Sequence, residues 1–96
     1  MKLVKVIKSD HPGKKWAAVF DTDGRTKTTH FGASGMDDYT IKHDKEQRAR
    51  YRERHKKDLE TKDPTRAGFL SYWLLWGDHT SLQENLASYR KRFHLG

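Results

Sequence analysis

The sequence predicts a single α+β domain over residues 1–96, with a three-stranded antiparallel β-meander followed by three α-helices in the order β-β-β-α-α-α. Three observations carry this prediction. Short β-branched and aromatic runs separated by turn signals fill the first third of the chain. Helix-favouring charged residues fill the middle. Toward the C-terminus, apolar residues recur with the spacing of an amphipathic helix.

Three strands are expected before residue 32. Residues 3–7 are rich in β-branched side chains, and within residues 16–20 Trp16, Ala18 and Phe20 share one face of a strand. Residues 26–31 are rich in threonine, which suits a partly exposed sheet. Asp10–Gly13 contains Pro followed by Gly, which suits a turn between the first two strands. Asp23-Gly24 is a strong signal for a two-residue hairpin loop between the second and third.

Three helices are expected after the glycine-containing connection at residues 32–36. The first covers about Thr40 to Lys57 and is rich in good helix formers, with residues 58–62 as a linker. The second covers about Thr65 to Trp76, with Asp63-Pro64 at its start and Gly77 in the C′ position at its end. Because this helix is apolar almost all round, we expect it to be the buried centre.

The last helix follows the capping box that begins at Ser81 and includes Glu84. Leu82, Leu86 and Tyr89 share one face with Phe93 at helical spacing, so an amphipathic helix is predicted there.

The positive charge of the chain is concentrated in one segment. Lys and Arg number 20 against 13 Asp and Glu, for a net charge of +7, and residues 42–57 hold eight of these cations but only three of the acids. Charge gathered on one element indicates a polyanionic partner, of which nucleic acid is the first candidate.

The cations of this helix fall into two rows at i, i+3 and i+4 spacing. The first row is Lys45, Arg48, Arg52 and Lys56, and the second is Arg50, Arg54 and Lys57. Either row can neutralise successive phosphates of a nucleic-acid backbone. The alternative is a solvated helix whose cations are partly paired by Glu46 with Arg50 and by Glu53 with Lys57. A membrane-surface helix is disfavoured, because the segment lacks a face of large apolar residues.

Several function classes are excluded or weakened by composition. The absence of Cys removes disulfides, zinc-thiolate sites and cysteine nucleophiles. No apolar run is long enough for a transmembrane helix, and the lysine-rich N-terminus is no signal peptide, so we expect a protein that is neither secreted nor membrane-bound. The loop at 32–36 lacks the Gly-Lys-Ser/Thr of a phosphate-binding P-loop.

No cofactor and no metal ion are expected. Scattered histidines leave one alternative open, a metal-dependent nuclease assembled in three dimensions. Its residues would be His30, Asp38, His43 and His55. Among the aromatic residues, most must pack in the small core, and Tyr39 and Tyr51 are the ones best placed to stack on bases.

Several separated motifs occur in an order that resembles a family of small uncharacterised proteins of large DNA viruses of algae and amoebae (phycodnavirus- and mimivirus-like). These motifs are Trp16–Phe20, His30-Phe31-Gly32, Gly35, Asp38-Tyr39-Thr40, Arg50-Tyr51, Arg54-His55 and Leu75-Trp76-Gly77. The resemblance implies a viral protein located in the virion or in the nucleus or cytoplasm of an infected cell, and it implies no activity. It draws attention to a candidate specific site at Gly32, Gly35, Asp38, Tyr39, Arg54 and His55.

The sequence therefore favours a small, basic, non-enzymatic nucleic-acid-binding protein that contacts DNA or RNA through residues 42–57. The alternative is a virion structural or tethering protein whose arginines meet acidic surfaces of other virion proteins. A homodimer would suit a chain with so few apolar residues.

Overall fold

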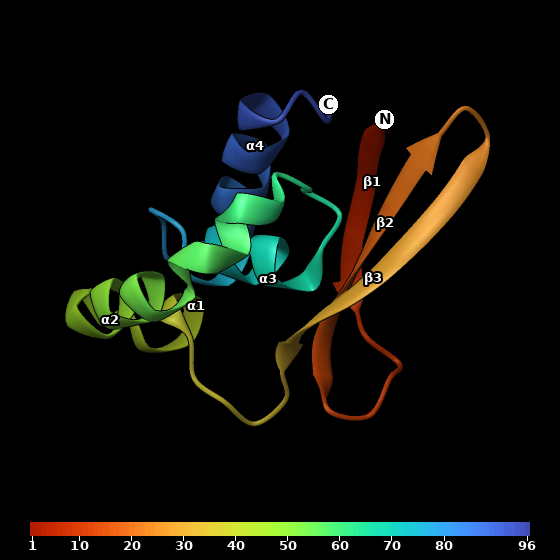
Figure 1. The fold of residues 1–96 in the computed structure, drawn as a ribbon. Helices are drawn as coiled ribbons and strands as arrows, with labels where there is room; N and C mark the ends of the chain where they lie inside the picture. Colours follow the sequence, from red (N-terminus) through yellow and green to blue (C-terminus); the bar gives the residue numbers. More distant parts are fainter.

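The computed structural model describes all residues 1–96 and has a three-stranded antiparallel sheet followed by helices (Figure 1). The strands are β1 (Lys2–Lys8), β2 (Lys14–Thr22) and β3 (Arg25–Ala33), and their order in the sheet is β1-β2-β3. The predicted α+β class and the β-meander are confirmed, and each strand is longer at both ends than expected.

The turn between β2 and β3 is the predicted two-residue hairpin. Thr22 pairs with Arg25, and the two residues between them have positive φ angles, 50° at Asp23 and 82° at Gly24. Two consecutive positive φ values are what a type I′ turn requires, which explains the Asp-Gly sequence.

The helical part contains four α-helices rather than the three predicted. They are α1 (Tyr39–Lys42), α2 (Lys45–His55), α3 (Ala67–Leu70) and α4 (Leu82–Arg92). A 3₁₀ segment, η1 (Lys56–Thr61), follows α2, and a π-helical segment, η2 (Ser71–Leu75), continues α3. None of these helices combines the length and the apolar character that crossing a membrane requires.

The helix predicted from Thr40 to Lys57 is broken near its start. His43 adopts a left-handed conformation with φ 57°, and the Asp44 side chain accepts hydrogen bonds from the backbone N–H groups of Glu46 and Gln47. An Asp at this position satisfies amide groups that a helix start leaves free, so a new helix begins here. The linker predicted at residues 58–62 is also wrong, because η1 extends through most of it.

The next helix begins later than predicted, at Ala67. Asp63 does not cap it, because its carboxylate accepts hydrogen bonds from the backbone N–H and the hydroxyl of Thr65 and so closes a turn. The left-handed C′ position predicted for Gly77 is wrong, because its φ is not positive; a glycine is needed here because a side chain has no room. A Cβ at Gly77 would lie 2.7 Å from Oδ1 of Asn85 and would also collide with the carbonyl oxygen of Trp73.

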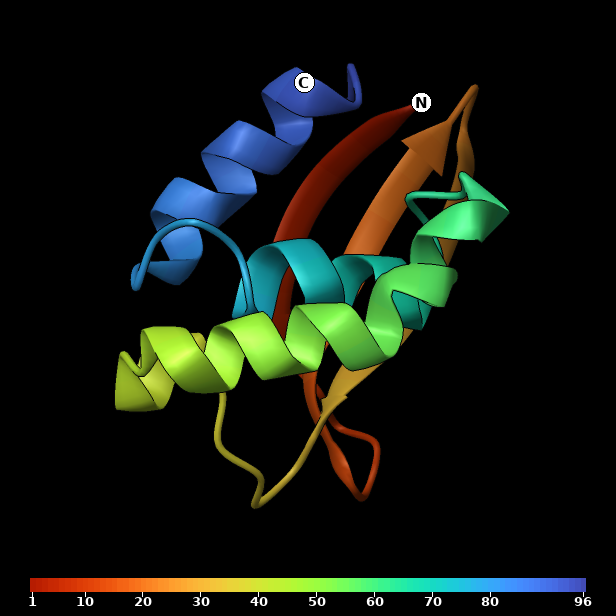
Figure 2. The same ribbon diagram turned by 60° about the vertical axis from the view of Figure 1, so that its left-hand side comes forward.

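The helices cover one face of the sheet, with α3 and η2 between the sheet and α2 (Figures 1 and 2). The predicted burial of the central helix is confirmed. Buried side chains from the strands meet those of the central and last helices in one core, which includes Leu3, Ala18, Phe20, Phe31, Phe69, Leu70, Leu74, Leu75, Leu86 and Tyr89. The capping interaction before α4 is also confirmed, because the Ser81 side chain accepts a hydrogen bond from the backbone N–H of Glu84.

Asn85 connects α4 to the end of η2. Its side chain, 2% exposed, donates to the carbonyl oxygens of Leu74 and His79 and accepts from the backbone N–H of His79. These bonds hold the turn at residues 76–79 in one conformation, and that turn is where α2 docks.

Replacement of Gly77 by alanine tests this packing. Because the added methyl group has no room between Asn85 and the Trp73 carbonyl, we expect Gly77→Ala to destabilise the protein by about 3 kcal/mol. Thermal unfolding followed by circular dichroism measures the loss, and Gly96→Ala, where a Cβ meets nothing within 4 Å, is the matched control. Equal melting temperatures for the two variants would contradict the packing argument.

Candidate nucleic-acid interface

Arg48 attaches α2 to the turn that follows η2. Its Nη1 donates to the carbonyl oxygens of Gly77 at 3.2 Å and Asp78 at 3.4 Å. The guanidinium also lies 4.4 Å from the ring centroid of Tyr39, in the geometry of a cation–π contact. This arginine, predicted to contact phosphate, is instead part of the fold.

Arg52, one turn further along α2, makes a second attachment to the same turn. Its Nε donates to the Trp76 carbonyl oxygen at 2.8 Å, and its Nη2 donates to Oδ1 of Asp78 at 3.0 Å. The hydrogen bond from Arg52 holds the pKa of the Asp78 carboxyl below its usual range, and the charges of Arg52 and Arg48 act in the same direction. The prediction that Arg48 and Arg52 present free charges is therefore corrected: backbone carbonyls and one carboxylate already bind them.

The two lysines of the first row differ from each other. Lys56 donates to Glu53 at 2.8 Å, and this hydrogen bond raises the pKa of Lys56. Lys45 is exposed and makes no ion pair in the structure. The first row thus has one unpaired member out of four.

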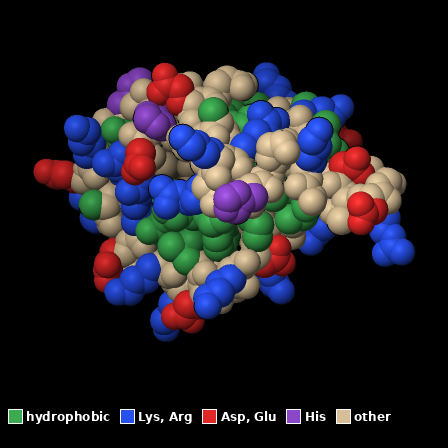
Figure 3. Space-filling view, turned by 90° about the horizontal axis from the view of Figure 1, so that it is seen from above, with side chains coloured by type: hydrophobic (Ala, Val, Ile, Leu, Met, Phe, Trp, Pro, Cys, Tyr) green, Lys and Arg blue, Asp and Glu red, His purple; other side chains and the backbone are tan.

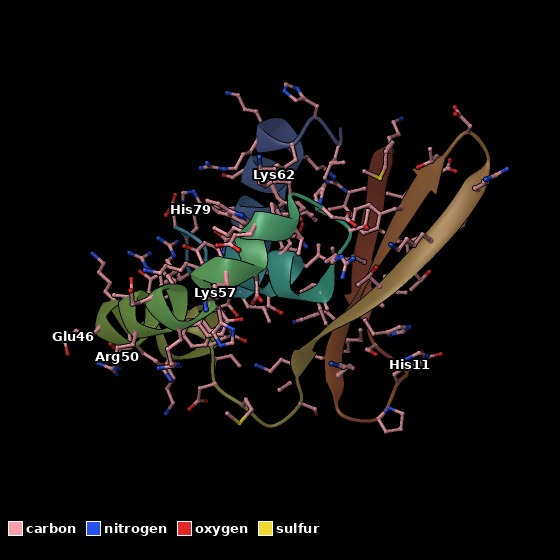
Figure 4. The ribbon with its side chains drawn as sticks, in the orientation of Figure 1. His11, Glu46, Arg50, Lys57, Lys62 and His79 are labelled. Carbon is pink, nitrogen blue, oxygen red and sulfur yellow. The ribbon has the colours of Figure 1, made fainter.

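The second row is free along its whole length. Arg50, Arg54 and Lys57 are exposed and form no ion pair or side-chain hydrogen bond. The two internal ion pairs that the sequence allowed do not form, because Glu53 binds Lys56 and Glu46 has no partner. In Figure 4, Arg50 lies beside Glu46 toward the start of α2, and Lys57 lies where η1 begins.

The face of the protein shown in Figure 3 carries charges of both signs. There, Lys and Arg side chains are interspersed with Asp and Glu around a hydrophobic stretch. Neighbouring charges of opposite sign weaken the field at such a surface. Within residues 42–57, the unpaired cations are Lys45 of the first row and all three cations of the second row.

A cavity of about 480 Å³ lies beside this row. One wall is α2, which contributes Gln47, Tyr51 and Arg54 at i, i+4 and i+7 together with His55. The opposite wall is the connection from Gly32 to Asp38, and the side chains beneath are Lys15, Ser71, Leu75 and Trp76.

Asp38 and Lys15 form an ion pair in this cavity. Asp38 is 1% exposed, and its Oδ2 accepts a hydrogen bond from Lys15 Nζ at 2.6 Å. Its other oxygen accepts from the backbone N–H and the hydroxyl of Thr40, so Asp38 also caps α1. Both carboxylate oxygens of Asp38 therefore bind groups of the fold, and these contacts hold Asp38 in a structural role. Lys15 lines the cavity with one of its three donors occupied.

Three rings are stacked at the α2 wall. The Tyr51 and Trp76 rings are 4.4 Å apart at an interplanar angle of 9°, and the Tyr51 and His55 rings are 4.1 Å apart at 20°. Burial raises the pKa of the Tyr51 hydroxyl to about 12, with the negative charge of Asp58 adding to the effect. The Tyr51 ring is thus packed against both Trp76 and His55 and fixes the α2 wall of the cavity.

The residues singled out by the motif resemblance largely come together here. Gly32, Gly35, Asp38, Arg54 and His55 all line the cavity. Tyr39 does not, because it is 5% exposed and lies under Arg48. Neither composition nor spacing indicates that Lys15 and Trp76 line a cavity. The i, i+4, i+7 spacing of Gln47, Tyr51 and Arg54 does indicate that these three share one face of a helix.

Of the four residues of the nuclease hypothesis, Asp38 and His55 line the same cavity, whereas His30 and His43 do not. His30 lies instead with Asp10 and His11 at the β1–β2 turn, where ligand atoms of the three lie within 4.8 Å of one another. The two imidazole rings are stacked 3.4 Å apart at 15°. Nδ1 of His30 also lies 2.7 Å from the hydroxyl oxygen of Ser9, within hydrogen-bond distance. Figure 4 shows His11 on this turn, well away from α2.

Comparison with known proteins gives one match. The model of a family of unknown function, DUF5754, matches residues 4–55, which include all of α2 and the whole connection from β3. No curated protein and no solved structure matches the chain significantly.

Arg52→Gln tests the docking of α2. The variant loses the hydrogen bonds to the Trp76 carbonyl and to Asp78, and we expect the Asp78 bond to account for about 1 kcal/mol of the stability lost at neutral pH. Because the pKa of Asp78 is lowered in the folded protein, this contribution is present above the unfolded pKa and disappears as the pH falls through the folded value. NMR titration of the Asp78 carboxyl should show its pKa rising toward 3.8, the ordinary value, in the variant. An unchanged pKa would contradict the role of Arg52, and Arg50→Gln is the control expected to leave both stability and pKa unaltered.

Proposed function

Since the chain belongs to the family of unknown function DUF5754, we propose a function from the site itself: a small, non-enzymatic nucleic-acid-binding protein that contacts phosphates through Arg50, Arg54 and Lys57. One observation carries the proposal. These three cations have no partner in the protein, while Arg48, Arg52 and Lys56 of the same segment do.

The spacing of the row supports contact with a repeating polyanion. Residues 50, 54 and 57 lie on successive turns of α2 and the start of η1, which places neighbouring cationic groups about 5–6 Å apart at their bases. A nucleic-acid strand carries one phosphate per nucleotide, so adjacent cations can contact adjacent phosphates. The two arginines also offer the planar, two-donor geometry that suits phosphate oxygens.

Helix geometry removes Lys45 from this contact. Nine residues separate Lys45 from Arg54, and at about 100° per residue they lie on opposite sides of the helix. A single strand along the row therefore contacts Arg50, Arg54 and Lys57 but not Lys45. The seven cations expected from the sequence are reduced to three that can act together.

The motif resemblance supports a further proposal, an origin in a large DNA virus. In that setting, an acidic surface of another virion protein is the alternative partner for the same row, because carboxylates and phosphates are both bound by arginine. The spacing of the three cations at i, i+4 and i+7 favours nucleic acid, whose charges are regularly spaced.

The test is a triple variant, Arg50→Gln/Arg54→Gln/Lys57→Gln, titrated with labelled duplex DNA at several salt concentrations. We expect binding to weaken and the slope of log affinity against log salt to become shallower by about 2–3, close to one unit for each lost phosphate contact. The matched control, Lys2→Gln/Arg25→Gln/Lys91→Gln, removes the same charge from exposed sites on other elements.

The control should keep nearly the full slope of the unmodified protein. An equal loss in both triple variants would show that only net charge matters, which would contradict a defined row. A protein that binds no nucleic acid at low salt would refute the proposed function and favour the acidic protein partner.

A further inference from the structure

The cavity beside α2 has the size and lining of a ligand site. Its volume of about 480 Å³ falls within the range of small-molecule pockets, about 300–1,000 Å³. Leu75, Tyr51 and Trp76 supply apolar surface, and the polar or charged side chains of the lining come from Lys15, Asp37, Asp38, Gln47, Arg54, His55 and Ser71. Arg50 and Lys57 of the row do not line this space, so phosphate contacts alone leave most of the cavity unused.

Arg54 belongs to both the row and the cavity. It is exposed on α2 between Arg50 and Lys57, and it also lines the cavity beside Tyr51. A phosphate bound by Arg54 therefore places its attached nucleoside at the mouth of the cavity. This shared residue connects a backbone contact to a site of nucleoside dimensions.

The cavity also offers groups that recognise a base. The Gln47 side chain forms no hydrogen bond in the structure, and an amide presents both a donor and an acceptor to a base edge. Lys15 adds donors that its bond to Asp38 leaves free. These groups lie around an apolar floor, the combination that holds an unstacked base.

Met36 provides a further sign of an unfilled site. It lines the cavity yet is 63% exposed, more than any other large hydrophobic side chain of the protein. A flexible thioether chain at the rim can pack over a planar ligand, and binding would remove its apolar surface from water.

We infer that this cavity accepts one unpaired nucleobase, so that the protein prefers single-stranded nucleic acid to duplex. The inference rests on the proposed phosphate contacts of Arg50, Arg54 and Lys57. A base within a duplex is stacked on both faces and paired along its edge, so it cannot enter a concave site without being extruded. A single strand supplies the same phosphates together with accessible bases.

The experiment compares labelled oligonucleotides that differ only in their bases. Fluorescence anisotropy at low salt measures affinity for a thymidine oligonucleotide, its uridine RNA counterpart, an abasic strand of equal length and a duplex. We expect the base-containing single strands to bind about tenfold more tightly than the abasic strand. The abasic strand keeps the phosphates, so it isolates the contribution of the cavity, and the DNA and RNA strands show whether the sugar is distinguished.

Two variants change the cavity without changing the row. Ala33→Leu narrows the cavity from an exposed position, and Gln47→Ala removes the free amide. We expect each to reduce the preference for bases over the abasic strand while leaving abasic binding unchanged. Ser34→Leu is the matched control, because Ser34 is an exposed neighbour that does not line the cavity, and thermal unfolding verifies that all three variants fold.

The outcomes separate the two proposals. Equal affinity for thymidine and abasic strands, with loss of both in the triple row variant, would overturn the base site and leave phosphate binding standing. An unchanged base preference in both cavity variants would also overturn it. Absence of binding to every oligonucleotide would overturn the proposed function and this inference together.

Discussion

The attachment of α2 to the turn after η2 by Arg48 and Arg52 determines which α2 side chains face the cavity and which face solvent. Both guanidinium groups bind carbonyl oxygens of residues 76–78, which are available because the π-helical segment ends at Leu75 and Asn85 fixes the following turn. These contacts set the rotation of α2 about its axis. The same rotation directs Gln47, Tyr51 and Arg54 toward the cavity and leaves Arg50 and Lys57 in solvent.

The elements that could be predicted are those with complete local signals. Asp23-Gly24 specifies its hairpin through backbone angles alone, and Ser81 with Glu84 marks the start of α4 through one short-range hydrogen bond. Helix propensity alone does not predict the break before α2. The side chain of Asp44 stabilises the start of a new helix by capping it and would add little within a continuous helix. The pairing of Arg52 with Trp76 had no local signal, since its acceptor is a backbone carbonyl 24 residues away in sequence.

The candidate site shows the same division between local and tertiary information. The row of Arg50, Arg54 and Lys57 follows from the spacing of these residues. They are unpaired because the nearby carboxylates bind other cations: Glu53 binds Lys56, and Asp78 binds Arg52. The cavity depends on the Lys15–Asp38 ion pair, which joins β2 to the connection after β3 across 23 residues. Removing either partner would leave a buried charge uncompensated, so this pair holds the wall opposite α2 in place. The motif resemblance nevertheless pointed to five residues that line the cavity, namely Gly32, Gly35, Asp38, Arg54 and His55. These residues share no periodic pattern in the sequence.

The most direct test of the central claim is NMR mapping of the protein's backbone amides and arginine Nε–H groups during titration with a thymidine oligonucleotide. The structure predicts shifts at Arg50, Arg54 and Lys57 and around the cavity near Gly35, with the Arg52 Nε–H unchanged because it stays bonded to the Trp76 carbonyl. Shifts confined to the open face of the sheet, or loss of the Arg52 hydrogen bond on binding, would contradict a preformed interface on this side of α2.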